Sequence, residues 1–429
     1  MKLRATYLDI DSLPGPSDVP PSKPGTYQLR VFVNNSVTAA SCSARLLYIL
    51  IGISNVNLIK LPFGKRLFED AAMKKLSIAA LVIFIIVGLG YSQRETLITR
   101  LLERGIEARM GGSNYLDSLN DGLHVGLCGA GGPMPAPNAS GPCVAVVAGD
   151  QFFTVDSGTD SVRNLSRMGY PVGDLDGVLI THFHSDHIDT LGELATIRWA
   201  GGDNRSPMPV YGPPGIERVV DGFNMAYAQD FNYRNEHHGD LVTPMSAAGS
   251  EARPFDLPSD GELVRIHDRD GLTIDALAVG HSPVEPAVGY LFRYKGRSAL
   301  VTGDTIKHPN IIQFSQGIDL LVHEALAPNI VMMMNAGAKS IGNPIMEKIT
   351  IDILDYHASP MDAAETAKEA GVGHLLYYHI VPPLLVPGQE LVFLDGAQDV
   401  FPDYTIGVDG VRFSMPANSD EIIKTHKGL

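Results

Sequence analysis

One seven-residue segment, Thr181-His182-Phe183-His184-Ser185-Asp186-His187, constrains this chain more than any other part of its sequence. It directly follows the apolar run 177–180, which predicts a buried strand. Alternate residues of an extended chain point to the same side, so His182 and His184 can face one metal ion together. Asp186 and His187 follow in a turn and can face a second ion. Imidazole and carboxylate suit zinc, iron or manganese, so the segment predicts a two-metal site at a strand end.

Four further polar residues stand at the ends of short apolar runs. They are Asp156 in FFTVDSG, His281 in VGHS, Asp304 in VTGDT and His379 in LLYYHI. Taken singly, a histidine that ends a strand is more often a structural residue, and an Asp after Gly is typical of a turn. Their shared position at strand ends makes them candidates for the same site.

In this order the residues resemble the metallo-β-lactamase superfamily, whose motif is His-x-His-x-Asp-His after a strand, over about residues 120–415. The resemblance implies an α/β fold, an αββα sandwich of two mixed β-sheets flanked by helices. It implies that Asp156 supports the metal loop from behind. The ligands it implies are His182, His184 and His281 for one ion, Asp186, His187 and His379 for the other, and Asp304 between them.

The implied cofactors are two divalent metal ions, with Zn²⁺ preferred and Mn²⁺ or Fe²⁺ as alternatives. Two such ions about 3.5–4 Å apart hold a bridging water as hydroxide near neutral pH. The metal-bridged hydroxide would attack an aryl sulfate, a phosphodiester or a lactone, and Asp186 is a candidate catalytic residue as well as a ligand. We therefore expect a metal-dependent hydrolase that acts on ester bonds.

Three segments resemble the branch of ribonuclease Z and the zinc arylsulfatases. They are the glycine-rich stretch CGAGGPMPAPNAS (128–140), His323-Glu324-Ala325-Leu326 and His357-Ala358-Ser359. By this resemblance His357 is a candidate general acid for the leaving group, and His323 or Glu324 orients it. The alternative roles are structural: a polar residue at a helix start for His357, and a polar pair at a strand end for the other two.

Several features separate the chain from ribonuclease Z itself. Ribonuclease Z carries a long arm for tRNA between the ligands that correspond to His281 and Asp304, whereas 22 residues (282–303) separate them here. The net charge is −15, and residues 76–429 hold 23 basic and 43 acidic residues. Enzymes of nucleic acids usually present a basic patch. Together with the export signal described below, these features favour an exported hydrolase whose partner is a small-molecule ester over an enzyme that acts on nucleic acid.

Two alternatives of a different kind stay open. A ribonuclease Z-like endonuclease that processes tRNA 3′ ends would need a local basic groove on this acidic chain. A non-hydrolytic metal-binding module could use the same fold, although all seven ligand positions are filled. The oligomeric state is left open, with a homodimer as one alternative.

The stretch before residue 92 carries a candidate export signal. Met73-Lys74-Lys75 precede the apolar run 76–89, in which Ser77 is the one polar residue. A basic start, a short apolar run and small residues predict a signal peptide or an uncleaved signal anchor at 73–91, with a buried core helix as the alternative. We expect residues 1–72 to be a poorly structured extension, with Met73 as an alternative start. The expected location is periplasmic or secreted, or held at the membrane by residues 76–91.

The remainder divides into a lead-in helix at 92–115 and a catalytic domain at 116–429. Cys128 and Cys143 are expected either to pair, as in an oxidising compartment, or to stay buried as thiols. The segments 222–238 and 327–350 are candidates for shaping a substrate pocket. For the run 331–334 in the second segment, core packing is the expectation, because methionine is usually buried.

Overall fold

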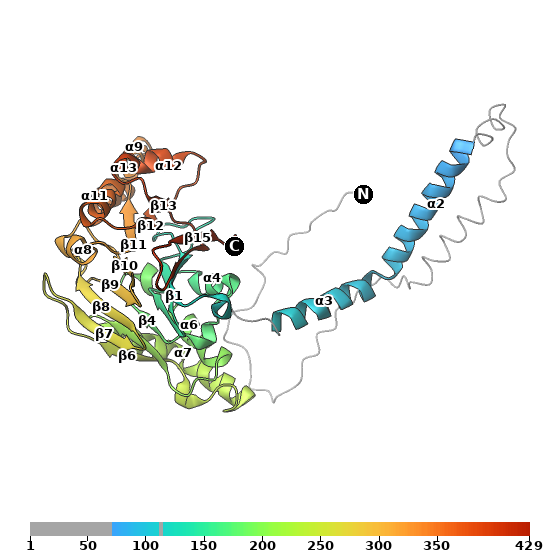
Figure 1. Cartoon of the computed structure of the whole chain (residues 1–429), viewed down its shortest axis with the longest axis horizontal. Helices are drawn as coiled ribbons and strands as arrows, with labels where there is room; N and C mark the ends of the chain where they lie inside the picture. Colours follow the sequence, from blue (N-terminus) through green and yellow to red (C-terminus); the bar gives the residue numbers. More distant parts are fainter. Residues whose placement is uncertain (1–70, 111–114) are drawn as a thin grey trace, which may run out of the picture. The chain divides into compact units, whose positions relative to one another are not determined.

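The computed structural model describes residues 71–110 and 115–429 (Figure 1). They fall into two units that divide between Ile106 and Glu107. The first unit contains α2 (Ala71–Ser92) and most of α3 (Arg94–Met110). The signal or anchor expected at 73–91 falls on α2, and the lead-in helix expected at 92–115 falls on α3 as far as residue 110. The extension expected at 1–72 lies, up to residue 70, outside the described residues.

A helix that spans a bilayer must be both long and apolar. Within the described part of the chain, no single helix meets both requirements. The stretches Ile78–Ser92 and Arg94–Glu107, with a bend of 60° between them, meet these requirements only when they are taken together.

The second unit contains two mixed β-sheets. In the described residues the first sheet has eight strands, in the order β15-β14-β1-β2-β3-β4-β5-β6, and the second has seven, in the order β13-β12-β11-β10-β9-β8-β7. The strands of the first sheet are β1 (Gly122–Gly129), β2 (Cys143–Ala148), β3 (Gln151–Val155), β4 (Gly177–Leu179), β5 (Met208–Gly212), β6 (Ser250–Pro254), β14 (Val411–Pro416) and β15 (Ile423–His426). Those of the second are β7 (Val264–Arg269), β8 (Leu272–Ala278), β9 (Val288–Tyr294), β10 (Arg297–Val301), β11 (Leu320–Leu326), β12 (His374–Val381) and β13 (Tyr404–Ile406).

Helices cover the outer face of each sheet. The first sheet packs against α4 (Ser161–Met168), α6 (Leu191–Gly201) and α7 (Ile216–His238), and the second against α8 (Pro309–Phe314), α11 (Pro360–Ala370), α12 (Gln389–Leu394) and α13 (Ala397–Val400). Strand β2 is apolar on both of its faces because each face packs into a core. Val144 and Val146 lie in the core between the two sheets, whereas Ala145 and Val147 lie in the core between the first sheet and its helices. The predicted αββα sandwich of two mixed sheets is confirmed.

The strand directions bring the candidate site residues to one edge. Strands β3 and β4 are parallel, and so are β10, β11 and β12. Strand β8 runs antiparallel to β9, which runs antiparallel to β10, so β8 ends at the same edge as β10. Asp156, His281 and Asp304 follow the carboxyl ends of β3, β8 and β10, where open α/β sheets place their ligands.

Cys128 and Cys143 form a disulfide between the neighbouring strands β1 and β2. Of the two alternatives that the sequence left open, the structure shows pairing.

Candidate metal centre

The motif folds as its spacing predicts. After β4 ends at Leu179, residues 180–184 lie outside helices and strands, and His184, which has an extended backbone, directly precedes α5 (Ser185–Ile188). This segment brings Nε2 of His182 within 3.1 Å of Nδ1 of His184. The short helix carries Asp186 and His187, which turns them toward a neighbouring point.

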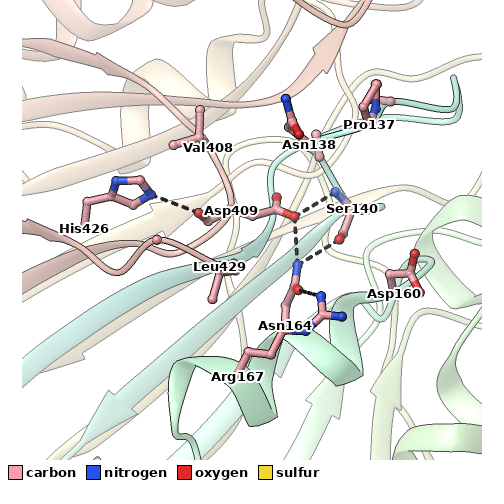
Figure 2. Close-up of a pocket in the computed structure, with 13 residues that line it drawn as sticks. Pro137, Asn138, Ser140, Asp160, Asn164, Arg167, Val408, Asp409, His426 and Leu429 are labelled. Atoms are coloured by element: carbon pink, nitrogen blue, oxygen red, sulfur yellow. Dashed lines mark hydrogen bonds between the residues drawn. The ribbon is translucent and has the colours of Figure 1, made fainter. Parts of the chain in front are cut away.

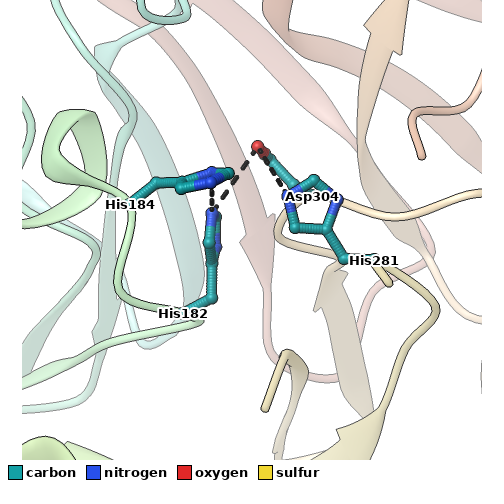
Figure 3. A group of neighbouring side chains, drawn as sticks. All are labelled: His182, His184, His281 and Asp304. Carbon is teal, nitrogen blue, oxygen red and sulfur yellow. Dashed lines mark hydrogen bonds and ion pairs between the residues drawn. The ribbon is translucent and has the colours of Figure 1, made fainter. Parts of the chain in front are cut away.

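Asp304 lies at the centre of the histidine cluster, and Figure 3 shows its carboxylate facing the rings of the first ligand group. Its Oδ2 atom lies 3.8 Å from Nε2 of His182 and 3.9 Å from that of His281. The same oxygen lies 3.4 Å from Nε2 of His187 and 3.3 Å from that of His379. One carboxylate oxygen thus faces both ligand groups, which is the geometry that a bridging ligand requires.

The donor atoms fit two metal ions. Those of His182, His184, His281 and Asp304 all lie within 4.8 Å of one another, and so do those of Asp186, His187 and His379. Several donor atoms are also buried without a hydrogen-bond partner, which is costly unless a cation binds them. These are Nε2 of His187, Nε2 of His281 and Oδ1 of Asp304. The His/Asp cluster therefore fits a dinuclear metal site, in the two groups that the sequence predicts.

A β-bulge aims His379 at this cluster. In the β11–β12 ladder Glu324 pairs with Tyr378 and Ala325 pairs with Ile380, so His379 is an extra residue without a partner opposite it. Its φ angle is 45°, in the left-handed region that residues other than glycine rarely adopt. Bulges of this kind redirect side chains and are common beside active sites.

Hydrogen bonds behind the ligands fix their ring orientation. Asp156 contacts Nδ1 of His187 at 2.8 Å and accepts a hydrogen bond from the backbone N–H of Thr181 at 2.9 Å. The carbonyl oxygen of Tyr356 accepts a hydrogen bond from Nδ1 of His281 at 2.8 Å. Both contacts leave Nε2 of the histidine facing the cluster. A histidine that binds a metal through one ring nitrogen commonly donates the N–H of the other to a carboxylate or a carbonyl oxygen. Asp156 thus occupies the supporting position that the sequence predicts.

The pKa shifts describe the cluster without its ions. Burial, followed by the neighbouring His187, holds the pKa of His182 well below its usual range, and burial likewise lowers the pKa of His281. Burial opposes a charge on Asp304, but His379 and His187 outweigh it and hold its pKa well below its usual range. For His187, burial is outweighed by Asp304 and Asp156, so its pKa is raised well above the usual value. A metal ion would replace that proton, because metal binding releases protons from its ligands.

Replacing Asp156 by Asn is expected to weaken metal binding by about 10- to 100-fold, as is usual when a group behind a metal ligand is lost. The substitution keeps the volume but removes the charge that orients His187. Competition with a chelator measures the change in affinity. Asp176→Asn is the control, because Asp176 accepts a backbone hydrogen bond from Phe152 in the same sheet and lies outside the cluster. Equal affinity in both variants would contradict the supporting role.

Next to the cluster, Glu324 binds His357. The Oε1 atom of Glu324 lies 2.8 Å from Nδ1 of His357, and it also accepts a hydrogen bond from the backbone N–H of Thr305 at 2.9 Å. Burial would lower the pKa of His357, but the charge of Glu324 outweighs it and raises that pKa to about 9. His323 is directed elsewhere, since its Nδ1 bonds the carbonyl oxygen of Glu324 and its ring is fully buried. Of the two predicted orienting residues, the structure brings Glu324 to His357, and not His323.

Asp409 is a residue that the sequence analysis missed. It lies after β13 in a Val-Asp-Gly turn, and such turns are too common to indicate a role. Its carboxylate accepts a hydrogen bond from the backbone N–H of Ala130 at 2.9 Å. It also accepts hydrogen bonds from the backbone N–H of Ser140 at 2.9 Å and from the side chain of Asn164 at 2.7 Å (Figure 2). Asp409 thereby closes the glycine-rich loop 130–140 at both ends.

That loop packs directly against the ligand His379. A Cβ atom added to Gly132 would lie 2.8 Å from Cγ2 of Val381 and 3.1 Å from Cε1 of His379, so glycine is required at this close approach. The loop therefore forms part of the wall around the second ligand group.

Asp409→Ala is expected to destabilise the fold by about 2–3 kcal/mol, because two backbone N–H groups lose their acceptor at about 1–3 kcal/mol each, partly recovered by water. Denaturant unfolding measures this loss. Asn138→Ala is the matched control, because Asn138 is exposed in the same loop. If the two variants unfold at the same denaturant concentration, Asp409 does not fasten the loop.

The two segments proposed to shape the pocket have different positions. Residues 222–238 lie within α7, and none of them lines the cavity beside the metal cluster. The segment 327–350 forms α9 (Pro328–Ser340) and most of α10 (Pro344–Asp352), which do line it. Core packing was the wrong expectation for most of the run 331–334: Val331 is buried, whereas Met332 and Met333 are exposed and Met334 lines the cavity.

Comparison with known proteins identifies the family. The family model described as "Beta-lactamase superfamily domain" matches residues 153–380. Ribonuclease Z of Mycobacterium bovis (strain BCG / Pasteur 1173P2) is 36% identical over 272 residues, which are 62% of this chain and 89% of that protein. The chain belongs to the metallo-β-lactamase superfamily. Ribonuclease Z of Mycobacterium tuberculosis (strain ATCC 25618 / H37Rv) is 35% identical over 272 residues, with the same shares.

Among solved structures, the metallo-beta-lactamase fold protein YhfI from Bacillus subtilis matches with a TM-score of 0.50 and 20% identity. The match covers 68% of this chain and 100% of that one, and it shows the shared fold. Together with the His/Asp cluster, family membership makes this chain a metal-dependent hydrolase that is ribonuclease Z-like. The relatives favour the ribonuclease Z alternative over the small-ester preference of the sequence analysis.

Proposed function

We propose that this superfamily member hydrolyses phosphodiester bonds with two zinc ions, as a ribonuclease Z-like endonuclease that processes tRNA 3′ ends. The central position of Asp304, within 3.9 Å of four imidazole nitrogens, carries the proposal. Its support in sequence is the 36% identity to ribonuclease Z over 89% of that protein's length. When bound, two such ions activate water and stabilise the charge that develops on the ester oxygens.

The chain's own residues would handle the two protons of the reaction. Asp186 lies at the cavity side of the cluster, with its side chain 13% exposed, and would accept the proton of the attacking water. His357 lines the same cavity and would donate a proton from Nε2 to the leaving oxygen, since its Nδ1 is held by Glu324. A proton donor of this kind contributes about 10²–10⁴-fold to the rate.

A second candidate is hydrolysis of small esters, and the hairpin between two ligands favours it. Residues 282–303 are all described, and β9 and β10 occupy 288–294 and 297–301 of them. The connection between the strands is Lys295-Gly296, with positive φ angles at both residues, as in a tight hairpin turn. No long arm for tRNA extends from this part of the chain.

Side-by-side assays separate the two candidates. The zinc-loaded protein would be tested on a precursor tRNA, an aryl phosphodiester, an aryl sulfate and a lactone. Accurate cleavage at the tRNA 3′ end supports the endonuclease. Turnover of a small ester with the tRNA intact replaces it with the second candidate, and turnover of none contradicts both.

As part of the second candidate, we propose that residues 73–91 direct the catalytic domain out of the cytoplasm, to the periplasm or beyond. The basic start and the apolar run of this segment support the proposal. Fractionation of cells that express the full chain tests it: activity confined to the cytoplasm would contradict export. An exported enzyme would meet small esters more readily than tRNA precursors, so the location also bears on the choice of substrate.

A further inference from the structure

A cavity of about 510 Å³ opens beside the metal cluster. Its volume lies within the range of about 300–1,000 Å³ that is usual for ligand sites. It is lined in part by residues of both ligand groups, among them His184, Asp186 and Asp304. A substrate whose scissile bond lies at the cluster therefore places one of its groups in this cavity.

One wall of the cavity is apolar and comes from a face of α10 together with Ile353, which directly follows this helix. Met346, Ile349 and Ile353 line the cavity at positions i, i+3 and i+7, which lie above one another on a helix. Met334 of α9 adds a flexible side chain that adapts to irregular partners. Ile349 remains 44% exposed, so this apolar surface is open to a bound group.

The charges around the cavity exclude an anionic occupant for this wall. Among the described residues that line it, there is no lysine or arginine, and the one polar residue that α10 contributes is the uncharged Thr350. Lys348 of α10 is not in the lining and pairs with Asp352 at 2.7 Å. A phosphate held against the apolar wall would lack the cations that protein sites for phosphates provide.

We propose that this wall binds the uncharged, apolar or aromatic part of the leaving group. A methyl-sized group would leave the space beside the wall unfilled. His357 lines the same cavity, and its ring centre lies 5.7 Å from that of the ligand His379, so a group bonded to the oxygen that it protonates would extend into the space that Met346 and Ile349 also line. The inference rests on the proposed function, because it takes the scissile bond to lie at the metal cluster. It makes α10 a specificity-determining element.

Binding of two phosphonates to the zinc-loaded full chain tests this by calorimetry, without turnover. Phenylphosphonate and methylphosphonate carry the same anionic head, and the phenyl ring alone can reach the wall. We expect phenylphosphonate to bind at least about tenfold more tightly, since even a single methylene in an apolar pocket is worth that factor. In the variants Met346→Gln and Ile349→Asn, the ratio of the two phosphonate affinities should fall to about threefold or less, because the phenyl ring loses an apolar side chain that it contacts.

Ile345→Gln is the matched control, because Ile345 lies on the same helix, is 70% exposed and does not line the cavity. It should keep the wild-type ratio, and methylphosphonate affinity should stay constant in all variants, which shows that the cluster is intact. Equal affinity of the two phosphonates, or no binding of either, would overturn the inference. An intact ratio without phosphodiester turnover would instead overturn the proposed function and leave the pocket in place.

Discussion

Asp304→Ala is expected to lower turnover of a phosphodiester by at least about 10³-fold, because the charge stabilisation that metal ions supply is worth several kcal/mol and each 1.36 kcal/mol is a factor of ten. The effect should be large because Asp304 faces both ligand groups through one oxygen. Its loss removes one of the two carboxylates, Asp304 and Asp186, that would offset the charge of two cations. Metal analysis of the purified variant should show fewer bound ions per chain than in the wild type.

His184→Ala provides an independent check on the same site. His184 belongs to the first ligand group alone, so its loss should weaken one ion more than the other. Asp275→Ala is the control, since Asp275 is another buried carboxylate, 3% exposed, but pairs with Arg293 away from the cluster. If the Asp304 and His184 variants both keep full activity and two bound ions, the dinuclear assignment is wrong.

The local part of this site was predictable from the sequence. Period two places His182 and His184 on one side of an extended chain, and a turn redirects Asp186 and His187; both follow from backbone geometry within seven residues. The layered architecture was within reach for a related reason, since a strand that is apolar on both faces requires cover on both faces. The family resemblance supplied the order of the remaining ligands.

The non-local part was not predictable from residue patterns. His379 reaches the cluster through a β-bulge, which depends on the register of β11 against β12 and has no mark in the sequence LLYYHI. Asp409 contacts a loop that lies nearly three hundred residues earlier, so no local spacing reveals it. Met332 and Met333 are exposed although methionine is usually buried, and within the run 331–334 it is Met334 that lines the cavity; residue type alone does not show which side of α9 faces the core.

His357→Ala is expected to lower turnover of an alkyl phosphodiester by about 10²–10⁴-fold and that of a 4-nitrophenyl ester far less, because a good leaving group needs little help from an acid. The comparison separates proton donation from substrate binding. A variant that merely distorts the cavity should slow both esters by the same factor. Steady-state kinetics with the two substrates, at saturating zinc, gives the ratio.

Glu324→Gln is the companion variant, since it removes the charge that raises the pKa of His357 to about 9. The acid form of His357 exists below its pKa, so lowering that pKa should move the alkaline limit of turnover to lower pH. His323→Gln is the matched control, because it alters the adjacent residue of β11 but does not touch His357. If His357→Ala slows both esters equally and Glu324→Gln leaves the pH profile in place, His357 is a structural residue at a helix start, the alternative that its sequence context allows.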